Sequence, residues 1–167
     1  SLSQGNPDLN PEFTDSYELS YLHYLPFGVI TPGIFFRQTK DEIARSITLI
    51  DSVTTLTSFV NYNKSRSYGG EVLLNVQPYK FWSVNGTFSY FKTEVDATNL
   101  GSGNKNSGYS WSARAASNLI LPADLSLQLS YMYHGKRVSA QGTFDPMQMM
   151  DIGLKKDLFD KKLSLTL

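Results

Sequence analysis

Much of this chain alternates between apolar and polar residues with a period of two. The pattern is clearest at residues 82–90, where the apolar positions are Trp82, Val84, Phe88 and Tyr90. Successive side chains of a β-strand point to opposite faces of a sheet, whereas a helix brings every third or fourth residue to one face. The alternation therefore predicts an all-β chain, in which each strand has one apolar and one polar face.

Segments of this kind predict about eight strands, at residues 17–25, 29–40, 68–76, 82–90, 111–119, 125–133, 150–155 and 163–167. Pro32 lies inside the second of these strands and removes one backbone donor, so a bulge or a local break is expected there. The looser stretch at residues 41–66 is expected to continue this strand outward, turn near Asp51 and return toward the next strand.

The connections between the expected strands alternate in length. Short turns fall near residues 26–28, 78–80, 121–124 and 159–161, and long connections fall near residues 41–66, 93–108 and 135–146. Antiparallel neighbours place all the short turns at one end of the sheet and all the long connections at the other. Bacterial outer-membrane barrels have this asymmetry, with short periplasmic turns and long extracellular loops. The sequence thus predicts an antiparallel up-and-down transmembrane β-barrel fold.

Charged residues within the expected strands always take the polar positions. They are Glu18, Arg37, Glu71, Arg114 and Asp151. A Lys or Arg facing lipid at mid-membrane costs about 2–4 kcal/mol, so the apolar faces are assigned to lipid and these charges to the lumen. Aromatic residues at strand ends suit the girdles found at membrane interfaces, namely Tyr17, Trp82, Tyr90, Trp111 and Tyr133. A soluble ligand-binding β-barrel or sandwich would also alternate, and it remains an alternative at this point.

Composition and motifs give no sign of catalysis. The 15 Lys+Arg and 15 Asp+Glu balance, so nucleic acid is not an expected partner, and the chain has no cysteine. Its two histidines, His23 and His134, are far apart and lack ligand-like carboxylate spacing, so no metal site is expected. No G-x-S-x-G motif occurs, and the GSGNKNSG stretch at residues 101–108 lacks the ending of a phosphate-binding loop. We expect no enzyme, no catalytic residue and no cofactor, and the substrate-binding residues are unknown.

The N-terminal stretch GNPDLNPEFTDSYELSY, residues 5–21, is a stiff polar lead-in followed by a strand, because two prolines exclude helix and central strand from its first half. It resembles the segment that enters a late barrel strand in TonB-dependent outer-membrane receptors, in particular the barrel family abundant in Bacteroidetes. Further segments look like consecutive pieces of these receptors: FFRQTKDEI (35–43), SYGGEVLLNV (67–76), WSVNGTFSYF (82–91), YSWSARAASNLILP (109–122), LSLQLSYMY (125–133) and MMDIGLKKDLFDKKLSLTL (149–167).

The resemblance implies that residues 1–167 are part of one β-barrel domain, the C-terminal barrel portion of such a receptor. A plug domain, a TonB box and the final strand would lie outside it. The implied function is import of a large nutrient of the siderophore, cobalamin or glycan class through the Gram-negative outer membrane. A plug-less structural or passive outer-membrane barrel remains the alternative.

The same resemblance sets the expected partners. They are outer-membrane lipid and, in the full-length protein, a plug domain, TonB and an imported ligand of unknown identity. An isolated fragment of such a wall would have two open strand edges, and we expect it to self-associate through them.

Overall fold

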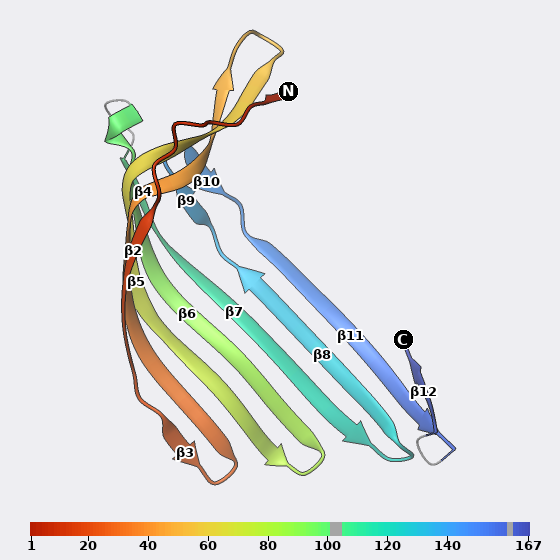
Figure 1. Ribbon diagram of the computed structural model, residues 1–167. Coiled ribbons are helices and arrows are strands. Elements are labelled where there is room, and N and C mark those ends of the chain that lie inside the picture. The colour runs from red at the N-terminus through yellow and green to blue at the C-terminus, as the bar shows by residue number, and fades with distance from the viewer. Residues whose placement is uncertain (101–104, 160–161) are drawn as a thin grey trace.

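A computed structural model describes residues 1–100, 105–159 and 162–167, and most of it is one broad, mainly antiparallel sheet (Figure 1). In order across the sheet, the strands are β2 (Phe13–Ser20), β4 (Gly28–Leu49), β5 (Thr55–Tyr79), β6 (Trp82–Asp96), β7 (Lys105–Leu121), β8 (Leu125–His134), β11 (Met147–Leu158) and β12 (Leu163–Thr166). Sheet order equals chain order, so the predicted all-β, up-and-down antiparallel fold is confirmed.

The remaining elements are short. β1 (Leu2–Ser3) pairs in parallel with β5, and β3 (His23–Leu25) continues the pairing of β2 along β4. β9 (Arg137–Ser139) and β10 (Gly142–Phe144) form a separate hairpin, and η1 (Thr98–Leu100) follows β6. In the described residues, no helix is long and apolar enough to cross a membrane.

Several strands are longer than predicted, and the predicted long connection at residues 93–108 is wrong in extent. β6 continues to Asp96 and β7 begins at Lys105, with Lys105 paired opposite Asp96. Apart from Val95, residues 93–96 and 105–108 carry no large apolar side chain, so the alternation fades although the backbone ladder continues. Residues 101–104 of the GSGNKNSG stretch lie outside the described residues, and its last four residues open β7.

Pro32 does not break β4, contrary to expectation. Its pairing with Val72 of β5 keeps the register of the whole β4–β5 ladder. On its other side the Tyr21 N–H donates to the Pro32 carbonyl at 2.9 Å, and Pro32 has no N–H to return the bond. The missing donor therefore interrupts the neighbouring ladder, which separates β2 from β3 without shifting the register.

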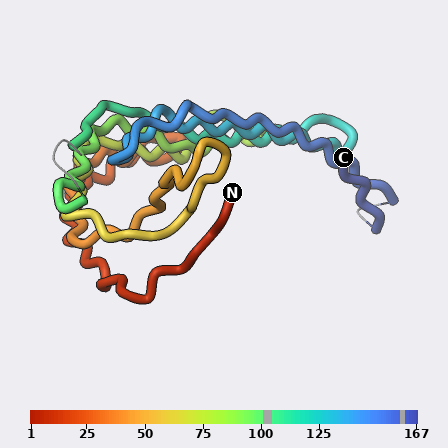
Figure 2. Tube along the Cα trace, turned by 90° about the horizontal axis from the view of Figure 1, so that it is seen from above, coloured from red at the N-terminus to blue at the C-terminus, as the bar shows by residue number. Residues whose placement is uncertain are grey.

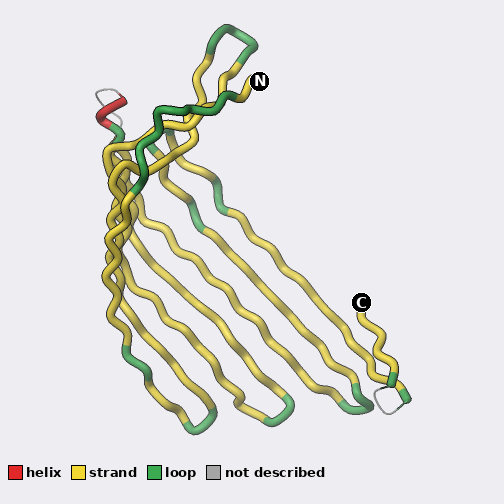
Figure 3. Tube along the Cα trace, in the orientation of Figure 1, coloured by secondary structure: helices red, strands yellow, loops and turns green. Residues whose placement is uncertain are grey.

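The two ends of the sheet differ as predicted (Figure 3). One end has short turns: Lys80 and Phe81 connect β5 to β6, and residues 122–124 connect β7 to β8. A register shift between Val76 and Tyr79 places Pro78 in a bulge next to the first of these turns. The expected turn at residues 159–161 lies partly outside the described residues. The other end carries the long β4–β5 hairpin and the β9–β10 hairpin.

The described sheet is curved but not closed (Figure 2). β2 and β12 lie at opposite edges, and within the described residues no ladder joins them. The β4–β5 hairpin and the N-terminal segment lie inside the arc that the strands form.

Candidate functional site

The strand register aligns the polar positions of all strands on one face of the sheet. Glu71 pairs with Ser89, Arg114 pairs with Thr87, and Asp151 pairs with Ser130. All five charged residues predicted for the polar face lie on it, and Arg37 and Glu18 form an ion pair at 2.5 Å. The face is not uniformly polar.

Two aromatic rings belong to this polar face. Phe35 and Phe91 pair with Gly69 from its two sides, and their ring centroids are 6.3 Å apart. The Arg37 guanidinium lies 5.4 Å from the centre of the Phe35 ring. Apolar and charged groups therefore lie side by side here, an arrangement suited to polar ligands that also carry apolar surface.

The opposite face is arranged in three tiers along the strands. Toward the short turns it is mainly aliphatic, with Leu119, Leu127 and Leu154 aligned on β7, β8 and β11 beside Trp82 of β6. An aromatic tier follows, in which ring contacts join Tyr17 to Phe36, Phe36 to Tyr68, Tyr90 to Tyr109, and Trp111 to Tyr133. Beyond it lies a charged tier that includes Lys40, Lys64, Arg66, Glu94, Asp96 and Lys105.

This order is the one expected where a strand leaves a membrane. Aromatic residues collect at the headgroup level, with apolar residues on one side and charges on the other. At about 3.4 Å per residue and a tilt of about 45°, the ten-residue advance from Trp82 to Lys92 spans roughly 24 Å along the membrane normal, close to the ~25 Å apolar band of outer-membrane barrels. Trp82 marks the short-turn boundary, where Tyr79 stacks on both Trp82 and Phe81.

Beyond the charged tier, the β4–β5 hairpin bends over the polar face. Asp41 has a φ of 53°, in the left-handed region, while its neighbours Lys40 and Glu42 keep their register with β5. Above this bend Tyr62 is only 3% exposed and packs with Val95 and Ala97, and Val138 of the β9–β10 hairpin lies against the same cluster. Two hairpins distant in sequence thus meet over the same end of the polar face.

A pocket of about 370 Å³ lies between these two hairpins. Its lining includes Glu42, Arg45, Tyr62, Gln141 and Phe144. The Oε2 atom of Glu42 is buried and has no hydrogen-bond partner among the described residues. Burial, and secondly the charge of Glu42, raise the pKa of Tyr62. The pocket presents a carboxylate, a guanidinium, an amide and aromatic surface, the groups that bind polar ligands by hydrogen bonds and ring contacts.

The residues 1–167 match the model of the outer membrane protein beta-barrel family. The chain belongs to this family. A comparison with curated proteins gave no match. Membership places the protein in the outer membrane, so the soluble barrel or sandwich alternative is wrong. In an outer membrane protein beta-barrel the tiered face contacts lipid, the polar face lines the lumen, and the pocket between the hairpins lies at the extracellular mouth.

Several residues singled out from the sequence lie apart from this mouth pocket. His23 stacks on Tyr21 near the short turns, at 6.1 Å between ring centroids, and His134 ends β8. In the described part of the chain, no three His, Asp or Glu residues are grouped so that they could hold a metal ion. The mouth pocket was not predicted, because its walls come from segments about 80 residues apart and no local motif marks them.

The N-terminal strap, residues 4–12, fixes the bend of the β4–β5 hairpin. The Glu12 carboxylate accepts a hydrogen bond from Ile43 N–H at 3.0 Å, just past the bend. The Asn61 side chain bonds Asn10 in both directions, at 2.9 and 3.0 Å, and donates to the Asp41 carbonyl at 2.6 Å. The strap predicted as a stiff lead-in to the sheet thus also holds the mouth in place.

Replacing Asn61 by alanine is expected to loosen the mouth without unfolding the sheet. The change removes three hydrogen bonds at about 1 kcal/mol each, so local opening should become easier by about 2–3 kcal/mol. Amide hydrogen exchange over residues 41–61 should then be at least roughly thirty-fold faster. Asn63→Ala is the matched control, since no hydrogen bond of the Asn63 side chain is found among the described residues. Equal acceleration in both variants would contradict the strap's role.

Proposed function

We propose that this chain forms wall and extracellular loops of a TonB-dependent outer-membrane receptor that imports a large nutrient. The observation that carries the proposal is the ordered series of receptor-like segments, from residues 5–12 to residues 149–167. The substrate would be of the siderophore, cobalamin or glycan class. The chain would contribute binding surface rather than catalysis, and a plug domain and TonB would be partners in the full-length protein.

The shallow curvature of the sheet supports a wide barrel. Barrel diameter grows with strand number, and barrels of about 22 strands are wide enough to contain a plug. The eight main strands span an arc and leave β2 and β12 at opposite edges (Figure 2). Further strands would pair with these edges, and the polar face would then line a lumen large enough for a plug and a large ligand.

The mouth supports a ligand-binding role over a purely structural one. Two hairpins fold inward rather than away from the sheet, and Gln141 of the second accepts a hydrogen bond from Ile47 N–H of the first at 3.1 Å. They enclose mixed polar and aromatic groups on the side from which a nutrient would arrive.

The proposal is tested by the energy requirement of uptake. Cells with and without the gene are compared for growth on limiting amounts of candidate siderophores, cobalamin and glycans, and uptake of any nutrient that depends on the gene is then measured. We expect uptake to stop when TonB is deleted or the proton-motive force is collapsed.

The passive alternative predicts the opposite result. A plug-less barrel would continue to admit solute in de-energised cells, and the purified intact protein would show steady conductance in planar bilayers. Gene-dependent uptake that survives TonB deletion would therefore overturn the receptor proposal in favour of the passive barrel.

A further inference from the structure

Three cations gather in the charged tier of the lipid-facing side, and none of them forms an ion pair within the described residues. Lys40 and Lys64 stand directly opposite each other on β4 and β5, and Arg66 lies two residues further along β5 on the same face. Like charges in directly opposed positions destabilise a sheet. We call Lys40, Lys64 and Arg66 the basic cluster.

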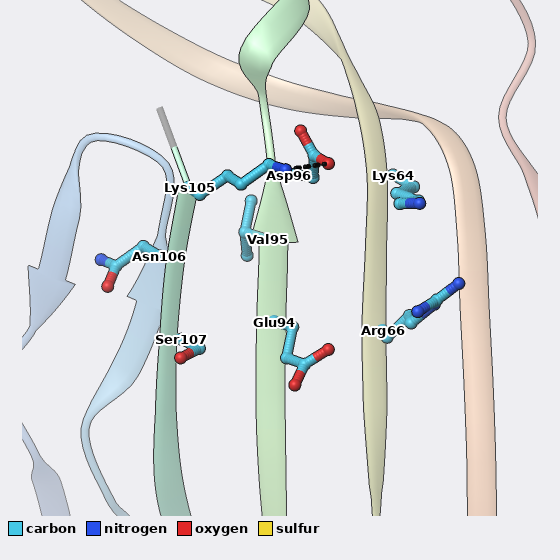
Figure 4. A pocket seen from close by; sticks show the side chains of 8 residues that line it. All are labelled: Lys64, Arg66, Glu94, Val95, Asp96, Lys105, Asn106 and Ser107. Atoms are coloured by element: carbon cyan, nitrogen blue, oxygen red, sulfur yellow. Dashed lines mark ion pairs between the residues drawn. The ribbon is translucent and has the colours of Figure 1, made fainter. Parts of the chain in front are cut away.

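Two carboxylates of β6 stand opposite the cluster, Glu94 across from Arg66 and Asp96 across from Lys64, but each forms its ion pair with another lysine. Glu94 forms an ion pair with Lys92 at 2.7 Å. Asp96 forms an ion pair with Lys105 at 3.5 Å, which Figure 4 shows. Arg66 donates to the neutral amide oxygen of Gln38 at 2.8 Å. Within the described residues, no member of the basic cluster forms an ion pair.

Two other carboxylates lie close to the basic cluster and do not neutralise it. Asp15 of the edge strand β2 lies opposite Gln38 of β4 in the strand register. Asp41 follows Lys40 directly and lines an open hollow beside the cluster. Neither forms an ion pair with Lys40, Lys64 or Arg66 in the described structure. The surface therefore holds unpaired positive charge on two adjacent strands.

The cluster borders two open hollows. One, of about 300 Å³, is lined by Gln38, Lys40, Asp41, Asn63, Lys64 and Arg66. The other, of about 560 Å³, shares Lys64 and Arg66 and extends over β6 and β7, where Glu94, Asp96 and Lys105 also line it (Figure 4). Figure 4 shows Arg66 extending from β5 toward β4, so its guanidinium lies on the side of the cluster.

The position of the cluster decides what kind of anion can reach it. It lies just beyond Phe36 and Tyr68 of the aromatic tier, on the face that contacts lipid and not on the face that lines the lumen. On β6, Lys92 pairs with Tyr68 and lies 6.0 Å from its ring centre, so charged residues begin there at the level of the aromatic tier. Lipid headgroups occupy this level, and their phosphates are the anions present there.

We propose that Lys40, Lys64 and Arg66 bind the phosphate of a lipid headgroup in the outward-facing leaflet. Guanidinium groups bind phosphate oxygens in a two-pronged geometry, and ammonium groups add compact charge. A phosphate between Lys40 and Lys64 would also remove their mutual repulsion. The site depends only on the chain's place in the outer membrane and holds for a receptor and a passive barrel alike.

The test uses the intact protein in nanodiscs of neutral phospholipid that contain a small fraction of lipid A, a glycolipid with phosphate groups. Native mass spectrometry counts the lipid A molecules retained, with dephosphorylated lipid A in a parallel sample. We expect retention of the phosphorylated form only, with Lys40→Gln, Lys64→Gln and Arg66→Gln each weakening it on the order of five-fold.

Controls distinguish this site from general charge effects. Lys80→Gln removes a lysine at the short-turn end of the barrel and should leave retention unchanged. Lys64→Arg keeps the charge and should restore most of the binding lost in Lys64→Gln. Millimolar inorganic phosphate should not displace the lipid.

Three results would overturn the proposal. Equal retention of phosphorylated and dephosphorylated lipid A would show that the phosphate is not recognised. A loss of lipid A retention in Lys80→Gln equal to that in the cluster variants would show that only the net charge of the protein matters. Displacement by free phosphate would make the cluster a site for soluble anions.

Discussion

Arginine in place of Leu129 is expected to destabilise the barrel by about 2–4 kcal/mol, the cost of a cation facing lipid near mid-membrane. Leu129 lies midway along β8 on the aliphatic tier, opposite Ser117 of β7 and Ile152 of β11. Among the described residues, its ladder neighbours on this face include no carboxylate with which the arginine could pair. The intact protein in phospholipid bilayers should unfold at lower urea concentration, and a smaller fraction should resist SDS before heating.

The matched control is Gln128→Arg, one residue away on β8. Gln128 lies on the polar face between Asn118 and Gly153, where an arginine remains hydrated. We expect a change within about 0.5 kcal/mol, as for most surface substitutions. A larger loss in Gln128→Arg than in Leu129→Arg would reverse the assignment of the two faces.

The assignment of faces is what the sequence predicted best, because alternation is a property of each strand alone. The structure places all five predicted charged residues on one face, because the strand register aligns the polar positions of neighbouring strands. They are Glu18, Arg37, Glu71, Arg114 and Asp151. The aromatic girdle residues were also identifiable, since they end the alternating runs. Periodicity is thus a dependable guide where one side of a strand is in lipid.

The ends of the strands could not be predicted in this way. At the end of the β5–β6 ladder where Lys64 pairs with Asp96, backbone hydrogen bonds hold the two strands together. Backbone hydrogen bonds do not depend on side-chain polarity, so the alternation of the sequence does not reveal them. The bend at Asp41 is another case, because it depends on Asn61 and Glu12, which contact it only in the folded chain. The mouth pocket depends on that bend, so it could not be predicted from the sequence either.

The bend also explains how one short stretch of β5 has three surroundings. Tyr68 belongs to the aromatic tier, Lys64 and Arg66 belong to the basic cluster, and Tyr62 is buried over the polar face. Below Asp41 and Asn63 the even-numbered side chains point toward lipid. Above these residues the even-numbered side chains Glu42 and Tyr62 point into the mouth. A ligand at the mouth and a lipid headgroup outside would therefore contact neighbouring segments of the same hairpin.

Gly69→Ala is expected to disrupt the β5–β6 ladder, and local sequence gives no means of distinguishing Gly69 from its neighbour Gly70. A methyl group on Gly69 would overlap the carbonyl oxygen of Tyr90 and approach the Cα of Phe91 to 2.6 Å. These are backbone atoms of the paired strand, so β6 itself must move. The glycine also leaves room for the Phe35 and Phe91 rings to meet above it. We expect a loss of about 2–3 kcal/mol, as for overpacked interiors.

Gly70→Ala is the matched control for this change. Its added methyl would lie on the lipid-facing side, where the nearest atom is the Gly33 carbonyl oxygen at 3.6 Å, an ordinary van der Waals contact. The alanine also restricts the unfolded chain, so stability should be unchanged or slightly higher. Urea unfolding in bilayers and the heat-dependent gel shift should separate the two variants. If Gly69→Ala proves as stable as Gly70→Ala, the close approach of β6 to Gly69 is not a feature of the folded protein.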